Sequence, residues 1–182
     1  FPYTTLFRSL SLLEVFELPV PKEAISAVCD KIMDLEEHCE RAVVLGLLEV
    51  TEYQGNTFYR VPRILMNLLP DVENSELLKK AVHVLHKIWL QAEIKSEELY
   101  MEVYRLGRKG EDEKICIDTG NALVNLWFAE GRFSDALPVQ TEVLKMAKRV
   151  FGDNHPGVAT SLYKRARLHE PQGRPSEADR KS

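Results

Sequence analysis

Two histidines and three glutamates are the residues whose types and spacing could support catalysis. His83 and His86 stand three residues apart, so one helix face could present both, but no carboxylate or third ligand follows at the spacing of a metal site. Glu36, Glu37 and Glu40 could supply an acid and a base, although such a group more often forms a solvated helix face. The sequence therefore predicts no catalytic residue and no metal site.

The other common sources of chemistry are also missing from the sequence. Cys29, Cys39 and Cys116 show no CxxC spacing, and we expect reduced, buried thiols and a cytoplasmic location. Neither GxxxxGK[ST] nor GxGxxG occurs, so the chain has no nucleotide motif of its own. No apolar run approaches the roughly 18 residues of a membrane span, and no membrane partner is expected. The chain itself is predicted not to be an enzyme.

Charge divides the sequence into two parts. Residues 10–75 hold twelve Asp and Glu against five Lys and Arg, whereas residues 76–178 hold fifteen against sixteen. An acidic front half and a nearly neutral back half predict two units.

The front half predicts two helices over residues 21–32 and 34–46. Pro21 suits a first helical turn. Asp34 and Glu37 have the spacing of a capping box, which would start the second helix. The apolar residues of the first helix recur at helical spacing: Ala24, Ile25, Val28 and Ile32.

A β-hairpin is predicted next, from LLEVTEY and TFYRV with QGN between them. Gly55 and Asn56 tolerate the positive φ of a tight turn. Leu48 and Val50 alternate with polar residues, so we expect both on the buried face. RILMNLL then resumes a helix. A winged helix has three helices followed by a hairpin. The two predicted helices and the hairpin match the end of this order, and we assign residues 10–70 to such a domain.

DNA binding is the alternative function for this domain. Many winged helices place their third helix in the major groove. Here that helix presents Glu36, Glu37 and Glu40, with Arg41 as its only basic residue. Phosphate contacts require Lys and Arg. Nucleic acid is therefore not an expected partner, and a DNA-binding transcriptional regulator with a repeat sensor stays as the alternative.

A short motif repeats in the back half. EGRFSDA recurs as QGRPSEA 42 residues later, a period typical of helical repeats. We expect a helix over residues 114–130 before the first copy. Ser134 would cap the next helix, with Pro138 in its first turn, and a third helix would start near Val158. The packing stripe of the second helix is Ala136, Val139, Val143, Ala147 and Val150.

This pattern resembles the tetratricopeptide repeat in its longer, kinesin-light-chain-like form. The resemblance rests on Gly131-Arg132, on Ala136 with Pro138, and on FGDNHPGVATSL. It assigns residues 114–178 to tetratricopeptide repeats, the second of them truncated. Residues 71–113 offer two further helices as a bridge or degenerate repeat, in which Gly107 and Gly110 would end a helix. The predicted fold class is mainly α, with a winged helix and a helical repeat array.

The combination resembles the middle and C-terminal part of STAND-class, NB-ARC-like signalling NTPases. The segment CERAVVLGLLEVTEYQGNTFYRVPRIL is similar to their winged-helix segment. The resemblance implies a non-catalytic regulatory and protein-binding fragment, whose winged helix folds over a nucleotide held by an upstream domain in cis. No cofactor is expected in this fragment, and ATP or ADP is expected in the full-length parent.

Two sets of candidate site residues follow from these resemblances. NB-ARC proteins often carry Met-His-Asp after the wing, where this chain has Val-Pro-Arg, so Arg60 or Arg63 is either a substitute phosphate contact or a solvated surface residue. In the repeats, the first helices line a concave groove for a protein or peptide. Alignment places these residues in it: Asn121, Asn125, Tyr163 and Arg167.

Both ends of the chain resemble translated sequencing adapter. FPYTTLFRS, residues 1–9, matches an in-frame adapter translation, and DRKS, residues 179–182, matches the reverse complement of the same element. We expect a natural sequence over residues 10–178 that belongs to a longer protein.

Overall fold

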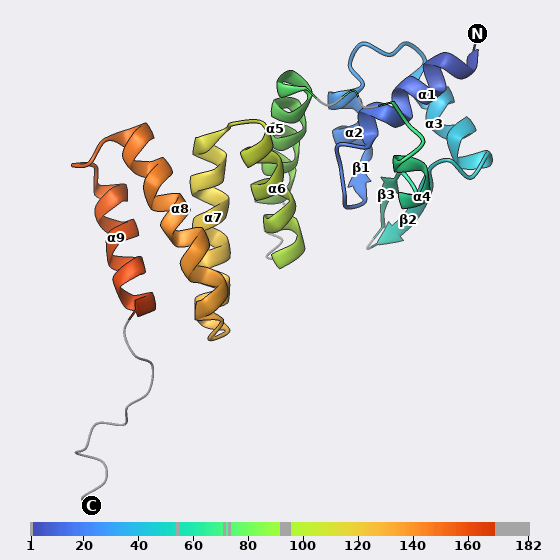
Figure 1. Cartoon of the computed structure of the whole chain (residues 1–182). Helices are drawn as coiled ribbons and strands as arrows, with labels where there is room; N and C mark the ends of the chain where they lie inside the picture. Colours follow the sequence, from blue (N-terminus) through green and yellow to red (C-terminus); the bar gives the residue numbers. More distant parts are fainter. Residues whose placement is uncertain (1, 54, 71, 73, 92–95, 170–182) are drawn as a thin grey trace, which may run out of the picture. The chain divides into compact units, whose positions relative to one another are not determined.

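The computed structural model describes residues 2–53, 55–70, 72, 74–91 and 96–169 (Figure 1). The chain forms two compact units, residues 1–119 and 120–182, whose boundary lies inside helix α7 (Glu113–Ala129). Helices dominate both units, and the described strands form one small antiparallel sheet. The mainly α fold class predicted from the sequence is confirmed.

The first part of unit 1 combines short helices with a three-stranded sheet. Its elements are α1 (Pro2–Leu13), β1 (Val20–Pro21), α2 (Lys22–Val28), α3 (Leu35–Val44), β2 (Glu49–Tyr53), β3 (Asn56–Arg60) and α4 (Arg63–Met66). The sheet has the order β1-β3-β2, and Tyr59 of β3 lies opposite Val20 on one side and Val50 on the other. The two-residue strand β1 was not predicted, because so short a segment has no alternation to detect.

Helix α1 anchors the start of the chain in the core. Leu6, Leu10 and Leu13 recur at helical spacing and are each at most 4% exposed. The buried Ser9 hydroxyl donates to the Thr5 carbonyl at 3.0 Å, which satisfies it inside the helix. The helix therefore includes residues 2–9 of the segment that resembles adapter sequence. The adapter origin stays a prediction.

Helix α3 begins at Leu35, directly after Asp34, but the capping box predicted for this start is wrong. Asp34 has φ 52° and ψ 35°, in the left-handed region, and its side chain makes no capping hydrogen bond. A capping residue normally has extended backbone, from which its oxygen reaches the next amides. Asp34 and Glu37 therefore form no capping box. Helix α2 also ends at Val28, four residues before the predicted end at Ile32.

The hairpin has the predicted turn but not the predicted burial. Gly55 adopts φ 77°, whereas Asn56 already belongs to β3. Leu48 is 3% exposed, but Val50 keeps 42% of its surface exposed, so the expectation that both are buried is wrong for Val50. Alternation tells which face a residue occupies. It does not tell whether another layer covers that face. Helix α4 is likewise four residues long, shorter than the helix predicted from RILMNLL.

Two longer helices follow in unit 1. Helix α5 (Ser75–Gln91) starts where the Asn74 side chain accepts from the Leu77 amide at 2.9 Å, and α6 (Glu97–Lys109) packs against it. Both helices were predicted. Helix α2 also packs on α5, and one buried cluster runs from α1 through α6. The core thus continues across the division predicted at residue 70.

Glycines near the end of α6 have different roles. Gly110 follows the last residue of α6, as predicted. Gly107 lies inside the helix, so its predicted role as a helix end is wrong. A Cβ atom there would lie 2.8 Å from the Cys116 Sγ, so Gly107 permits the close approach of α6 and α7.

A buried ion pair joins α6 to the segment after α1. Arg105 Nε and Nη2 lie 2.8 and 2.9 Å from the two carboxylate oxygens of Glu102, which is 4% exposed. The Glu17 amide donates to Glu102 Oε1 at 2.8 Å, and Arg105 Nη2 donates to the Val15 carbonyl at 2.8 Å. Residues 15 and 17, which are far from α6 in sequence, thus each form a hydrogen bond with one member of the ion pair.

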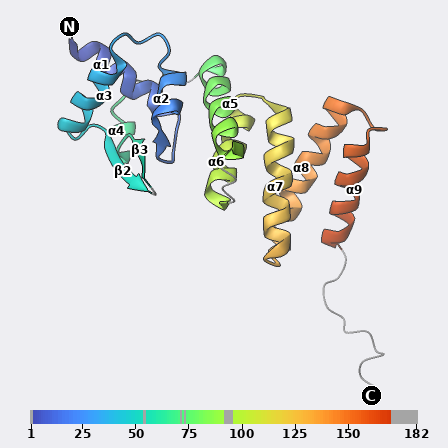
Figure 2. The ribbon, with the colours of Figure 1, turned by 180° about the vertical axis from the view of Figure 1, so that it is seen from behind.

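Unit 2 contains the rest of α7, α8 (Phe133–Phe151) and α9 (Pro156–His169) (Figure 2). Gly131, at φ 74°, ends α7 in a Schellman motif, in which the Arg132 amide donates to the Trp127 carbonyl. Arg132 is then the residue before α8, so Ser134 does not cap that helix. Pro138 is the sixth residue of α8, beyond the predicted first turn.

The face of α8 that packs on α9 contains a polar residue that the sequence did not predict. Ala136, Val143 and Ala147 of the predicted stripe are buried, and Val139 and Val150 are half-buried. Gln140 is fully buried among them. Its Nε2 donates to the Ser161 carbonyl of α9 at 3.3 Å, and its Oε1 has no partner.

Candidate functional site

Helices α7 and α9 meet through two side-chain contacts in unit 2. The Lys164 ammonium of α9 donates to Asn121 Oδ1 of α7 at 3.1 Å. One turn further on, the Arg167 guanidinium lies 4.5 Å from the centroid of the Phe128 ring of α7. These contacts place the two helices next to each other. We call the surface formed by Asn121, Asn125, Phe128, Tyr163, Lys164 and Arg167 the α7/α9 face.

The structure brings the four predicted binding residues to this face. Asn121 is half-buried and Asn125, one turn later, is exposed. Tyr163 keeps 64% of its surface exposed. Arg167 lies 5.9 Å from the Tyr163 ring as well as over Phe128, so it connects both helices. Their role in binding stays a prediction.

Lys164 was missed by the sequence analysis. It follows Tyr163 directly and is half-buried, and this burial lowers the pKa of its ammonium. The Asn121 amide oxygen solvates the charge but does not neutralise it. At the 42-residue offset that pairs Asn121 with Tyr163, Lys164 aligns with Ala122, which has no polar group, so the repeat did not reveal it.

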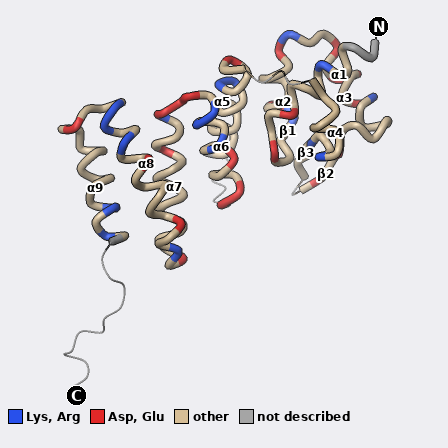
Figure 3. The backbone as a smooth tube through the Cα atoms, in the orientation of Figure 1, with Lys and Arg blue, Asp and Glu red and all other residues tan. Residues whose placement is uncertain are grey.

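Charge on α9 has a single sign. The helix carries Lys164, Arg165 and Arg167 and no Asp or Glu (Figure 3). Guanidinium and ammonium groups bind carboxylates, the former in a bidentate manner. Asparagine amides such as that of Asn125 can both donate to and accept from a peptide backbone. The α7/α9 face therefore has the chemistry to hold an extended, acidic peptide.

The predicted phosphate contacts lie elsewhere, in unit 1. Arg60 of β3 donates from Nε and Nη2 to Glu49 Oε2 of β2 at 3.0 and 2.6 Å, so its guanidinium is engaged across the hairpin. Arg63 is the first residue of α4 and is exposed. Their possible contact with a nucleotide stays a prediction.

The histidines form no cluster with metal ligands in the described residues. His83 Nε2 lies 2.9 Å from Asp112 Oδ2, a carboxylate that the sequence analysis did not connect to it. Burial lowers the pKa of the nearby His86. Across the described ranges, no three His, Cys, Asp or Glu side chains gather as metal ligands would. No helix described in this chain has both the length and the apolar composition needed to cross a membrane.

Residues 115–180 match the family model of the tetratricopeptide repeat. The match begins in α7, covers α8 and α9, and extends past the described residues. It confirms the repeat predicted from the recurring Gly-Arg motif. No curated protein and no solved structure matches the chain. Because tetratricopeptide repeats present binding surfaces for other proteins, the match supports a protein-interaction role for this part of the chain.

Proposed function

We propose that the α7/α9 face binds an extended, acidic peptide segment of a partner protein. The observation that carries this proposal is the placement of Lys164 and Arg167 against Asn121 and Phe128, beside the exposed Asn125. Two cations and two amides thus share one surface of neighbouring first helices. The partner's carboxylates contact the cations, and its backbone pairs with Asn125.

The electrostatics of the two cations favour an anionic partner. Burial destabilises the charged form of Lys164, and a carboxylate beside it compensates for that cost. Arg167 contacts two aromatic rings, and no described residue accepts a hydrogen bond from its guanidinium. The rings hold the planar group in place while its donors remain available for a bidentate carboxylate.

Peptide selection tests this proposal. A display library of random peptides is selected on the full chain, and the affinities of the recovered peptides are measured by fluorescence polarisation. We expect acidic peptides whose affinity falls with added salt. Lys164→Ala should weaken binding about tenfold, the size of a hydrogen bond to a charged group.

Lys145→Ala is the matched control, because it removes the same charge from an exposed position of α8. It should leave the affinity within about twofold. Circular dichroism of each variant establishes that it is folded. Recovery of neutral peptides, or equal effects of the two folded variants, would contradict the proposal.

We further propose that the chain is a regulatory part of a STAND-type NTPase, with a winged helix for nucleotide-dependent autoinhibition and repeats for partner sensing. The order α1-β1-α2-α3-β2-β3, with the sheet order β1-β3-β2, supports the winged-helix interpretation. The acidic surface of α3 favours packing within a larger protein over DNA binding. ATP or ADP would be held by the upstream domain, and a cytoplasmic location is part of this proposal.

Long-read sequencing of the source DNA tests this second proposal. We expect the reading frame to continue upstream of Leu10 into a phosphate-binding loop and downstream of Ala178 into further repeats. A methionine codon near Leu10 with no preceding nucleotide domain would contradict it. That outcome would favour the DNA-binding alternative.

A further inference from the structure

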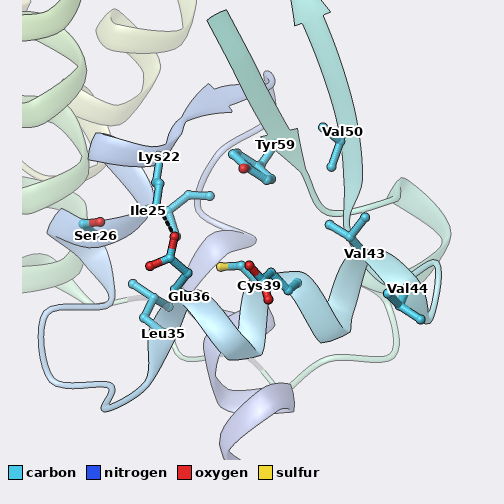
Figure 4. A pocket seen from close by; sticks show the side chains of 11 residues that line it. Lys22, Ile25, Ser26, Leu35, Glu36, Cys39, Val43, Val44, Val50 and Tyr59 are labelled. Atoms are coloured by element: carbon cyan, nitrogen blue, oxygen red, sulfur yellow. Dashed lines mark hydrogen bonds and ion pairs between the residues drawn. The ribbon is translucent and has the colours of Figure 1, made fainter.

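A cleft of about 640 Å³ lies in unit 1 between α2, α3 and the hairpin (Figure 4). Its volume falls within the roughly 300–1,000 Å³ of small-molecule sites. The apolar wall is formed by six residues from all three elements: Ile25, Leu35, Val43, Val44, Val50 and the ring of Tyr59. Cys39 of α3 also lines the cleft.

This cleft is open because no described segment covers it. Val44 and Val50 keep 85% and 42% of their surfaces exposed, although their neighbours Ala42 and Leu48 are buried. The alternation of β2 places Val50 on the inward face of the hairpin, but the space in front of it is empty. Burial of such apolar surface by a ligand is favourable at about 25 cal/mol per Å².

The polar groups of the cleft leave a net negative charge. Lys22 of α2 forms an ion pair with Glu36 of α3, so these two charges cancel at one side. Glu40 lines the cleft one turn after Glu36 and has no ion pair or hydrogen bond with any described residue. Glu52 shares the hairpin face of Val50, since residues two apart on a strand point the same way. A cation is therefore the charged group that this cleft accommodates.

We propose that this cleft binds a small amphipathic organic cation. Its apolar body lies against Ile25, Val43 and Val50, and its ammonium group lies at Glu40. The Tyr59 ring offers a second favourable surface to the cation. A carboxylate in the same position would face Glu40 without a free cation, because Lys22 is already paired with Glu36. The site is separate from the α7/α9 face and does not depend on peptide binding there.

Cys39 provides a local measurement of occupancy. It is half-buried, whereas Cys29 and Cys116 are buried, so Cys39 should react first with iodoacetamide. The full chain is alkylated at mildly alkaline pH with octylammonium or with octanoate, and the modified cysteine is located by mass spectrometry. We expect octylammonium to slow alkylation of Cys39 about fivefold more than octanoate does, the size of an exposed ion pair. No protection, or equal protection by both probes, would overturn the proposal.

Charge reversal identifies the carboxylate. Glu40→Lys should reverse the preference, so that octanoate protects Cys39 better than octylammonium does. Glu37→Lys changes the same charge on the same helix outside the cleft lining and should leave the preference intact. If Glu40→Lys does not fold, Glu40→Gln should abolish the preference for the cation. Reversal by Glu37→Lys as well, or a preference unchanged by either Glu40 substitution, would overturn the proposal.

Discussion

Replacing Arg105 with alanine should strongly destabilise unit 1. The Glu102 carboxylate would stay buried at 4% exposure but lose both bonds to the guanidinium, at 2.8 and 2.9 Å. The Val15 carbonyl would lose its donor as well. Among the residues that the structure describes, only the Glu17 amide, at 2.8 Å, would remain bonded to the carboxylate.

The structure limits the size of this effect. Removing one partner of a buried ion pair costs about 3–5 kcal/mol, because the remaining charge is left unpaired. The Arg105 side chain is 23% exposed, so water enters beside Glu102 when it is removed. Since the Glu17 bond also remains, we expect the lower end, about 3 kcal/mol. Replacing both Glu102 and Arg105 with methionine should cost less than Arg105→Ala alone.

Urea unfolding followed by tryptophan fluorescence measures this loss. In a Trp127→Phe background, Trp89 of α5, which is 7% exposed, reports on unit 1 alone. Arg108→Ala, an exposed arginine on the same helix, is the control and should cost less than about 1 kcal/mol. A loss of less than about 1 kcal/mol in the free energy of unfolding for Arg105→Ala would refute the argument that the Glu102 carboxylate needs Arg105 as its partner.

Three further predictions concern the packing and titration of single residues. Gly107→Ala should lower the free energy of unfolding by about 1–3 kcal/mol, because the new Cβ would lie 2.8 Å from the Cys116 Sγ. Adding Cys116→Ala should recover part of this loss, as measured by urea unfolding. Gln140→Met should change the stability of unit 2 in thermal unfolding by no more than about 1 kcal/mol, because it removes an unpaired buried oxygen together with one 3.3 Å hydrogen bond. A larger loss would show that the hydrogen bond to Ser161 stabilises the fold by more than the unpaired oxygen destabilises it. Burial raises the pKa of Cys29 from 9.0 to about 12, so the folded state keeps a proton that the unfolded state loses. The stability that Cys29 contributes should therefore fall between pH 9 and 12, and urea unfolding at several pH values should show the difference between wild type and Cys29→Ala shrinking there.

Local patterns were sufficient to predict most of the helices. The sequence indicated α5, α6 and α7, and the recurring Gly-Arg motif indicated the turn at Gly131. The same repeat offset aligned Asn121 with Tyr163, as equivalent positions of the first helices of the two repeats. Lys164 and Phe128 escaped prediction because their roles come from contacts between helices: Lys164 with Asn121, and Phe128 with Arg167.

Contacts between distant segments explain what the sequence did not reveal. The Glu102 and Arg105 pair resembles an ordinary surface pair at helical spacing, and nothing local indicates that residues 15–17 cover it. Asp34 was expected to cap α3, but it adopts a left-handed backbone conformation and its side chain makes no capping hydrogen bond. Val50 has the alternation of a buried strand residue, but the segments that could cover it leave a cleft instead.

A titration of the ¹⁵N-labelled full chain with one of the selected acidic peptides tests the central claim most directly. The account predicts backbone and side-chain amide shifts at Asn121, Asn125, Tyr163 and Lys164, with the largest changes on α9. In Lys164→Ala these shifts should need about tenfold more peptide to reach the same size. Shifts confined to α8, or spread over unit 1 with none on α7 or α9, would contradict the assignment of the α7/α9 face as the protein-binding surface.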